Sequence, residues 1–288
     1  MSDPQDSVPV TLAALTLYPV KGCRGIAVDT AEALVTGLAW QGICDREWMV
    51  IDAVGRFVTQ RELPSLALVV PSLRNGALQL RCEGREPLQV PLSDRAQGSR
   101  CVTVWRSDVL GFDAGDAAAE WLAAVLGRPL RLVRFDRAKP RHCNRDYVGD
   151  SGAHTLFADG YPMLVTNEAS LADVNARLAA RGLEGIPMNR FRPNVVVAGL
   201  AKPYAEDVIE SLRFGEVELK LVKGCTRCKV TATDQATAQV GVEPLRMLAS
   251  YRLDEELQGV VFGMNAIVAR GAGTTLQVGL RGTARFRA

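Results

Sequence analysis

The chain has 288 residues, 48% of them hydrophobic and 23% charged, which is typical of a soluble globular protein with one large or two ordinary domains. Its formal net charge of +2 excludes a strongly basic surface, so we expect no nucleic acid and no membrane among its main partners. Seven unevenly spaced cysteines indicate reduced thiols, and the polar N-terminus resembles no export signal, so we expect a cytoplasmic protein.

The first half of the chain contains short β-favouring runs separated by turn residues. They lie at residues 12–17, 47–52, 56–60, 66–70, 77–82 and 101–105. Many short strands at near-regular spacing predict a barrel or sandwich. A helix follows, with Asp116 as its cap, one apolar stripe and Gly127 at its end. Residues 134–152 are polar and basic, which predicts a long loop and a domain boundary.

The second half is also β-rich and has two predicted helices beside its strands. One helix starts after Asn167 and stops at Gly182, and the other begins at Pro244. The strands are expected at residues 194–197, 212–222, 260–269 and 275–280. No internal repeat is present, which excludes solenoids and propellers.

The most informative motif is Gly224-Cys225-Thr226-Arg227-Cys228, in which two thiols lie two residues apart after an apolar run. Four interpretations remain open: half of a zinc site, a redox dithiol, one metal-binding thiolate beside a bystander, or two half-buried cysteines in a turn. Zinc usually takes four soft ligands, and the other cysteines are scattered singly. A redox dithiol normally opens a helix, whereas residues 229–233 favour a strand. Lys223, Arg227 and Lys229 add positive charge, which favours a thiolate.

Four polar clusters lie at predicted strand ends or turns. They are Tyr18-Pro19-Val20-Lys21-Gly22, Asp45-Arg46-Glu47-Trp48, Asp159-Gly160-Tyr161-Pro162 and Arg190-Phe191-Arg192-Pro193-Asn194. Taken singly, each is typical of turn chemistry with a solvated charge. Together with the cysteine motif they make a pattern that extends over most of the chain.

With these motifs, the sequence resembles the MOSC family of molybdenum-cofactor proteins. The similarity is to the branch with a MOSC N-terminal β-barrel, which includes the mitochondrial amidoxime-reducing component and its bacterial relatives. Its strongest part runs from Tyr204-Ala205-Glu206-Asp207 to the cysteine motif. The resemblance implies a predominantly β (α+β) fold. We expect an N-terminal β-barrel-like domain over residues 9–130 and a β-barrel MOSC domain with flanking helices over residues 131–288.

The resemblance also implies a bound molybdenum cofactor, Mo-molybdopterin. Its metal ligand would be the Cys228 thiolate, with Cys225 as a bystander. The implied cofactor-binding residues are Lys21, Gly22, Arg46, Gly160, Tyr161, Arg192, Asn194, Thr226, Arg227 and Asn265. The arginines suit a phosphate because a guanidinium binds it through two parallel hydrogen bonds. Asp159, implied to lie beside the cofactor, is the expected proton donor, so Asp159 and Cys228 are the candidate catalytic residues.

The function that this resemblance implies is the reduction of N-hydroxylated compounds, such as amidoximes and hydroxylamines, by a molybdenum-dependent oxidoreductase. The chain lacks the four-cysteine run of a plant-type ferredoxin, so electrons are expected from a separate ferredoxin, flavodoxin or cytochrome-type protein. The alternative is a carrier of the molybdenum cofactor or its sulfur without substrate turnover, because MOSC domains also occur in molybdenum-cofactor sulfurases. A third hypothesis is a scaffold that has kept the fold and lost the metal.

Overall fold

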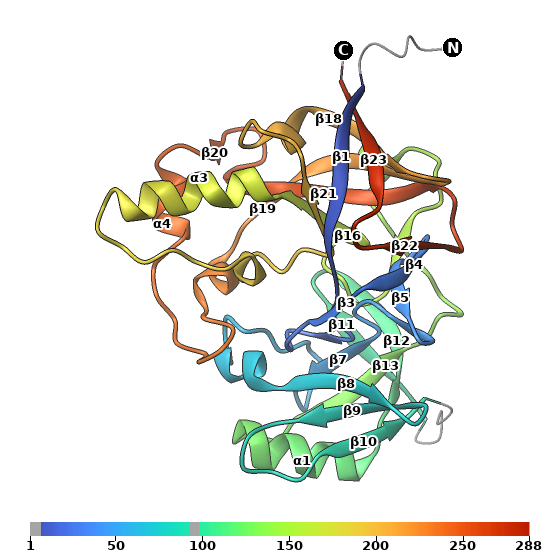
Figure 1. The fold of residues 1–288 in the computed structure, drawn as a ribbon. Helices are drawn as coiled ribbons and strands as arrows, with labels where there is room; N and C mark the ends of the chain where they lie inside the picture. The colour runs from blue at the N-terminus through green and yellow to red at the C-terminus, as the bar shows by residue number, and fades with distance from the viewer. Residues whose placement is uncertain (1–6, 93–97, 288) are drawn as a thin grey trace.

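A closed barrel of seven strands is the central feature of the computed structural model, which describes residues 7–92 and 98–287 (Figure 1). Around the barrel the strands follow the order β16 (Met163–Asn167), β17 (Val195–Ala198), β1 (Ser7–Leu17), β23 (Arg281–Phe286), β18 (Ile209–Phe214), β19 (Val217–Thr226) and β21 (Gly259–Arg270). Pairing of β21 with β16 closes the barrel, so its main strands have no free edge. The short strands β3 (Ile26–Val28) and β20 (Leu253–Asp254) pair with β1 and β21.

Alternating side chains fill the interior of the barrel. In β19, Val217, Leu219 and Leu221 are buried, whereas Glu218 and Lys220 between them are more exposed. This period of two is the pattern of a strand with one buried face. The barrel core is continuous with buried residues from the first half of the chain, such as Trp48. The first and second halves therefore share one hydrophobic core.

Smaller sheets, built mainly from the first half of the chain, lie below and beside the barrel in Figure 1. The largest has five strands, in the order β11 (Ser99–Val104), β12 (Ser107–Asp113), β13 (Arg131–Phe135), β7 (Trp48–Ile51) and β2 (Val20–Lys21). A second sheet contains β10 (Leu88–Pro91), β9 (Ala77–Arg81) and β8 (Val70–Arg74). A third contains β22 (Thr274–Gln277), β4 (Thr30–Leu34), β5 (Gly37–Trp40) and β6 (Ile43–Cys44). The last pair is β14 (Arg141–His142) with β15 (His154–Thr155).

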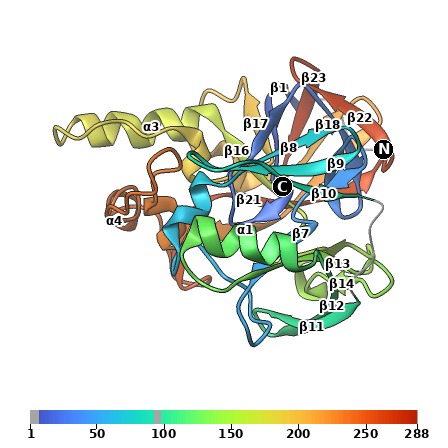
Figure 2. The same ribbon diagram turned by 90° about the horizontal axis from the view of Figure 1, so that it is seen from below.

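The helices lie outside the sheets. Helix α1 (Asp116–Leu126) lies at the end of the molecule away from the two chain ends, while α3 (Glu168–Ala179) and α4 (Leu245–Ala249) project together beside the barrel (Figures 1 and 2). Helix α2 (Arg145–Val148) and the 3-10 turns η2 (Pro64–Leu68), η3 (Met188–Arg190), η4 (Ala205–Val208) and η5 (Lys229–Ala232) are short. Within the described part of the chain, no helix has the length and apolar character needed to cross a bilayer.

The predominantly β fold class is confirmed, as are most of the predicted elements. Helix α1 begins at Asp116 and ends at Gly127, which has a left-handed φ of 72°, but Gly115 and not Asp116 occupies the cap position. Helix α3 is capped by Asn167 as expected, since its side chain accepts a hydrogen bond from the Ala169 N–H.

Several local predictions were wrong. Residues 56–60 form only isolated bridges and not a strand, because the chain there turns into the wall of a pocket. Residues 66–70 are mostly in η2, where Pro64 opens a 3-10 turn. The single strand expected at 212–222 is the β18–β19 hairpin, which turns at Gly215 with a φ of 59°. The expected loop at 134–152 contains β14 and α2. The domain limits at residues 130 and 131 remain a prediction.

The barrel leaves no room for a side chain at Gly282 in β23. A Cβ there would lie 2.3 Å from the carbonyl oxygen of Arg213 and 2.5 Å from Phe214 Cδ1 in β18. We expect Gly282→Ala to lower the free energy of unfolding by about 1–3 kcal/mol, as overpacking does, in a urea titration. The control is Gly241→Ala, whose nearest neighbour would be the Ala232 oxygen at 3.9 Å. Equal free energies of unfolding for the two variants would show that β18 and β23 accommodate a methyl group at Gly282 without destabilisation.

Candidate functional site

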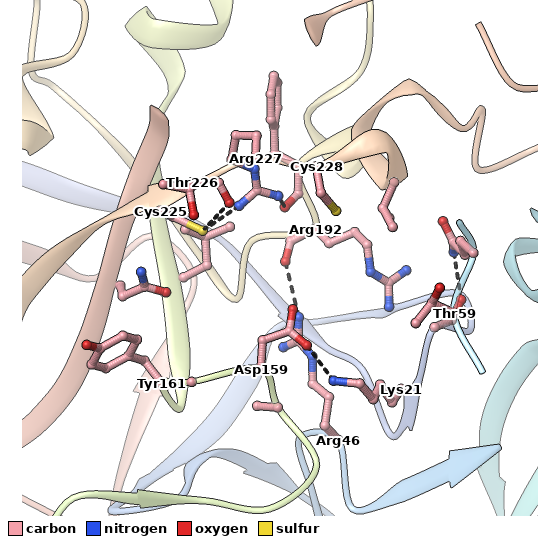
Figure 3. A pocket seen from close by; sticks show the side chains of 18 of the residues that line it. Lys21, Arg46, Thr59, Asp159, Tyr161, Arg192, Cys225, Thr226, Arg227 and Cys228 are labelled. Carbon is pink, nitrogen blue, oxygen red and sulfur yellow. Dashed lines mark hydrogen bonds and ion pairs between the residues drawn. The ribbon is translucent and has the colours of Figure 1, made fainter. Parts of the chain in front are cut away.

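One pocket contains all twelve residues that the sequence analysis assigned to a site (Figure 3). They are Lys21, Gly22, Arg46, Asp159, Gly160, Tyr161, Arg192, Asn194, Thr226, Arg227, Cys228 and Asn265. The pocket has about 960 Å³ of space, open solvent at its mouth included. Its wall combines barrel strands β19 and β21 with β2 and residues 58–61 of the first half. The individual roles of these residues remain predictions.

Two arginines of the pocket share the aromatic ring of Tyr18. The guanidinium carbons of Arg46 and Arg192 each lie 4.3 Å from the ring centroid. Both arginines have a left-handed backbone, with φ of 49° and 56°, a conformation that bulky residues adopt only where the surroundings impose it. Burial lowers the pKa of Arg192, and the positive charge of Arg46 adds to that effect. The chain thus holds two like charges close together at the pocket.

A buried carboxylate, Asp45, compensates one of these charges. It forms an ion pair with Arg46 and accepts hydrogen bonds from the Tyr18 N–H at 2.8 Å and from Asn194 Nδ2 at 2.9 Å. Asn194 in turn accepts a hydrogen bond from Arg46 Nη1 at 2.9 Å and from the Leu164 N–H at 3.2 Å. Burial raises the pKa of Asp45, and Arg46 and these hydrogen bonds oppose that shift. Asp45 belongs to one of the four polar clusters but was not predicted to be a site residue. Its position next to Arg46 in the sequence was the signal that could have indicated this role.

Besides the exposed Arg61, the pocket contains two guanidinium groups, those of Arg192 and Arg227, that have no carboxylate partner within residues 7–92 and 98–287. Arg192 Nη1 donates to Gln235 Oε1 at 3.3 Å, while Arg227 donates to Cys225 Sγ and to the Phe191 carbonyl, both at 2.7 Å. Arg227 Nε is buried and donates to no described residue. Buried cations normally pair with anions, so this end of the pocket suits a bound anion. A pterin phosphate would supply that charge, and the residues present fit the implied cofactor.

Lys21 and Asp159 form a second charged pair at the pocket. Lys21 Nζ donates to Asp159 Oδ1 at 2.5 Å and to the Phe157 carbonyl at 2.8 Å, and Trp105 Nε1 donates to the same carboxylate oxygen at 2.9 Å. Burial lowers the pKa of Lys21, and its ion pair with Asp159 opposes that shift. Desolvation by the pocket walls raises the pKa of Asp159, but Lys21 and the two hydrogen bonds outweigh it and hold that pKa well below its usual range. The lowered pKa of Asp159 favours its carboxylate form, and its role as a proton donor remains a prediction.

The two cysteines of the motif have different surroundings. Cys225 lies near the end of β19 against Arg227, whereas Cys228 is exposed and precedes η5. The expectation of a strand over residues 229–233 was wrong, because four of these residues form the 3-10 turn η5. A helical turn therefore does follow Cys228. A single 3-10 turn lacks the aligned dipoles of the helix that a redox dithiol normally opens.

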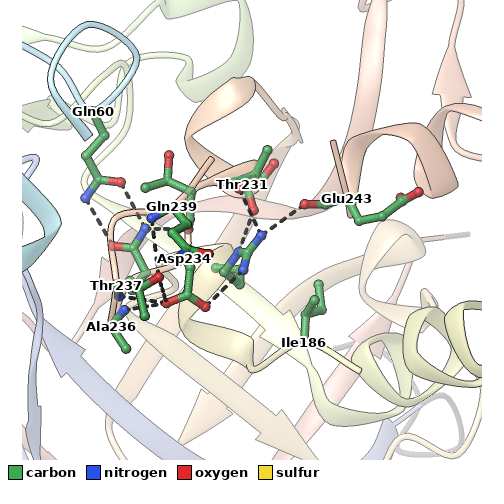
Figure 4. Close-up of polar contacts among 12 residues, drawn as sticks. Gln60, Ile186, Thr231, Asp234, Ala236, Thr237, Gln239 and Glu243 are labelled. Atoms are coloured by element: carbon green, nitrogen blue, oxygen red, sulfur yellow. Dashed lines mark hydrogen bonds and ion pairs between the residues drawn. The ribbon is translucent and has the colours of Figure 1, made fainter. Parts of the chain in front are cut away.

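Arg190 binds the segment that follows Cys228, and Figure 4 labels three of its partners, Thr231, Asp234 and Glu243. Its guanidinium is buried and donates to the carbonyl oxygens of Thr231 at 2.8 Å and of Ala232 and Glu243 at 3.0 Å. It also forms an ion pair with Asp234 at 3.4 Å. This fork determines the position of η5 and hence of Cys228. Arg190 belongs to one of the four polar clusters of the sequence, but this role was not predicted.

A pair of hydrogen bonds joins the side chain of Gln60, in the wall of the pocket and labelled in Figure 4, to that of Gln235, which also accepts a hydrogen bond from Arg192. Gln60 Nε2 donates to Gln235 Oε1 at 3.1 Å, and Gln235 Nε2 donates back to Gln60 Oε1 at 2.9 Å. Gln60 also donates to the Gly22 carbonyl at 2.6 Å, and Arg24 donates to the Gln235 carbonyl at 2.7 Å. Both glutamines are buried, so the reciprocal bonds satisfy polar groups that would otherwise be costly. No sequence signal indicated this contact.

Comparison with known proteins agrees with this architecture. Residues 9–129 match the model of the MOSC N-terminal beta barrel domain, and residues 152–280 match that of the MOSC domain. The chain belongs to the MOSC family. This MOSC protein is 36% identical over 251 residues to mitochondrial amidoxime reducing component 2 of Bos taurus, covering 84% of this chain and 72% of the relative. It is 34% identical over 264 residues to mitochondrial amidoxime-reducing component 1 of Homo sapiens, covering 89% and 76%.

The uncompensated charge of Arg192 predicts that inorganic phosphate stabilises the MOSC protein, because an anion that binds the folded state alone raises its melting temperature. In Arg192→Lys, phosphate should bind about tenfold more weakly, since an ammonium cannot form the bidentate contact. The control is Arg56→Lys, an exposed arginine already paired with Asp52 and Glu62. Thermal melts across a phosphate series measure both effects, and an equal phosphate response in the two variants would rule out an anion site at Arg192.

Proposed function

We propose that this MOSC protein is a molybdenum-cofactor-dependent reductase of N-hydroxylated compounds. One observation supports the proposal most directly: an exposed thiol, Cys228, lines the same pocket as two guanidinium groups without carboxylate partners within the described residues. A thiolate and an anion site are what a cofactor with a thiol-accepting metal and a phosphate requires. The relatives named amidoxime-reducing components give the substrate class.

Each part of the pocket has a defined task in this proposal. The cofactor, when bound, supplies the two-electron chemistry that removes oxygen from the substrate nitrogen. Cys228 would be its protein ligand, and Arg192 and Arg227 would hold its phosphate. Asn265 is oriented by its Nδ2 group, which donates to the carbonyl oxygens of Lys223 at 3.3 Å and Gly224 at 3.4 Å, so its Oδ1 is an available acceptor. At Gly160 no atom lies within 4 Å of a Cβ position, so a bound group can approach the backbone closely.

Protons for the reaction would come through Lys21 and Asp159 together. Lys21 carries the proton, its burial makes it a stronger acid, and Asp159 Oδ1 lies 2.5 Å from its Nζ. Asp159, whose side chain is 73% exposed at the pocket, would pass that proton toward the substrate. From the sequence, Asp159 alone was expected to donate the proton. We propose the Lys21–Asp159 pair in its place.

Electrons would come from a separate redox protein of the ferredoxin, flavodoxin or cytochrome type, and we keep a cytoplasmic location as part of the proposal. The test is reduction of an amidoxime by the cofactor-loaded protein with a chemically reduced viologen as donor. Amidine formation supports the reductase. Tight molybdenum binding without amidine formation would identify a cofactor carrier instead, and failure to bind molybdenum would identify a scaffold.

The two cysteines should respond differently to replacement by serine. Cys228→Ser should lose most of the bound molybdenum and about two orders of magnitude or more in activity, because the metal loses its only expected protein ligand. Cys225→Ser should retain both within about threefold, since a hydroxyl still accepts the Arg227 hydrogen bond. Elemental analysis and the viologen assay measure the two effects. Equal losses in both variants would instead indicate a dithiol or a site with two thiolate ligands.

The role of Lys21 predicts the alkaline limit of the reaction. A buried ammonium with a lowered pKa loses its proton below the ordinary value of 10.5, so kcat/KM should fall as pH rises through that lowered pKa. In Lys21→Arg the group stays charged, so the alkaline fall should move to higher pH even if the maximal rate is lower. Rate profiles of the two proteins from neutral pH up to the ordinary lysine pKa of 10.5 test this. An unchanged alkaline limb would exclude Lys21 as the proton source.

A further inference from the structure

Trp105 occupies an unusual position at the mouth of the pocket. It lies in the tight turn between β11 and β12, with a left-handed φ of 57° that a bulky residue seldom adopts. Backbone hydrogen bonds from the Phe57 N–H to the Thr103 oxygen at 3.2 Å and from the Thr103 N–H to the Gly55 oxygen at 3.0 Å anchor this hairpin. Its side chain lines the pocket and is 45% exposed. The fold thus holds a large aromatic surface open to solvent.

Three contacts fix the orientation of the indole. The Arg61 guanidinium carbon lies over the ring, 4.7 Å from its centroid, and the Phe57 ring lies 5.1 Å away at an interplanar angle of 53°. Its Nε1–H donates to Asp159 Oδ1 at 2.9 Å. A ring that is oriented on several sides and still half-exposed in a pocket is suited to stack on a ligand, because no side-chain freedom is lost when the ligand binds.

Asp159 connects this ring to the reacting end of a substrate. Lys21 Nζ and Trp105 Nε1 both donate to Oδ1. The second oxygen, Oδ2, accepts no hydrogen bond from the described residues, and the side chain is largely exposed at the pocket. A carboxylate oxygen accepts an N–H or O–H group, and an N-hydroxylated compound offers both. Trp105 therefore positions Asp159 and lies beside its free acceptor.

We propose that Trp105, supported by Arg61, is a stacking platform that makes the site selective for flat, conjugated N-hydroxylated substrates. The planar part of the substrate would lie against the indole, and its amino or hydroxyl group would donate to Asp159 Oδ2. Aryl amidoximes and N-hydroxylated bases would then be favoured over saturated analogues of the same size. This inference rests on the proposed reductase function, whose substrate class it narrows.

Two probes of similar volume and identical reacting group isolate the stacking contribution: benzamidoxime, which is flat, and cyclohexanecarboxamidoxime, which is not. In the cofactor-loaded protein with reduced viologen, Trp105→Ala should raise KM for benzamidoxime by about 3- to 10-fold, the usual contribution of an aromatic pair. KM for the saturated probe should change by less than about twofold. Trp105→Phe keeps an aromatic ring but loses the hydrogen bond to Asp159. It should therefore retain most of the preference for benzamidoxime that Trp105→Ala loses.

The matched control is Trp121→Phe, because this second partly exposed tryptophan lies in α1 and donates to the Glu86 carbonyl, outside the pocket. It should leave both KM values unchanged. Calorimetric binding of the two probes to the oxidised, cofactor-loaded protein gives a measurement that needs no turnover. Selective binding that is lost in Trp105→Ala, without amidine formation, would keep the platform and reject the reductase. Turnover with equal effects of Trp105→Ala on both probes, or no preference for benzamidoxime in the parent protein, would overturn the platform alone.

Discussion

The buried ion pair of Asp45 and Arg46 is the interaction on which the pocket depends. Through its two oxygens, Asp45 connects the end of β1 at Tyr18, the turn before β7 and the Asn194 side chain at the start of β17. These three segments are far apart in the sequence. If the carboxylate were absent, Arg46 and Arg192 would face the same Tyr18 ring with no compensating charge beneath them. Losing one partner of such a buried pair typically costs about 3–5 kcal/mol.

Asp45 compensates only part of the positive charge in the pocket. Asp45 balances one guanidinium, while Arg192 and Arg227 have no carboxylate partner in the described part of the chain and Arg227 Nε has no acceptor there. A protein that needed only stability would gain by replacing such cations with apolar side chains. Their presence at the wall of an open pocket is therefore better explained by a bound anion. The Arg190 fork binds the segment after Cys228, and the Gln60–Gln235 pair joins that segment to a loop of the first half of the chain.

The strands and helix ends that have a local sequence signal were predicted correctly. Short β-favouring runs bounded by turn residues predicted β9 and β11, and Asn167 and Gly127 marked helix ends, because each signal lies within a few residues of the structure it specifies. The site residues came from a family resemblance and not from spacing. The Gln60–Gln235 contact joins two loops 175 residues apart, and neither glutamine has a local signature. Likewise, Val230 and Thr231 favour a strand by propensity, but Arg190 binds the carbonyl oxygens of Thr231 and Ala232 and so favours the turn η5.

Charge pairing also divides the pocket into two functional ends. Lys21 and Asp159 neutralise each other, which leaves the exposed Arg61 beside Trp105, whereas Arg192 and Arg227 carry positive charge at the other end. In our proposal, an anionic cofactor would be attracted to the second end, whereas a neutral N-hydroxylated compound would not be. Such a compound would instead gain from an aromatic surface and a free carboxylate oxygen, which the first end offers. In our proposal, affinity for the cofactor and choice of substrate would thus depend on different residues of one pocket, so substitutions at Trp105 would alter substrate preference without weakening the anion site.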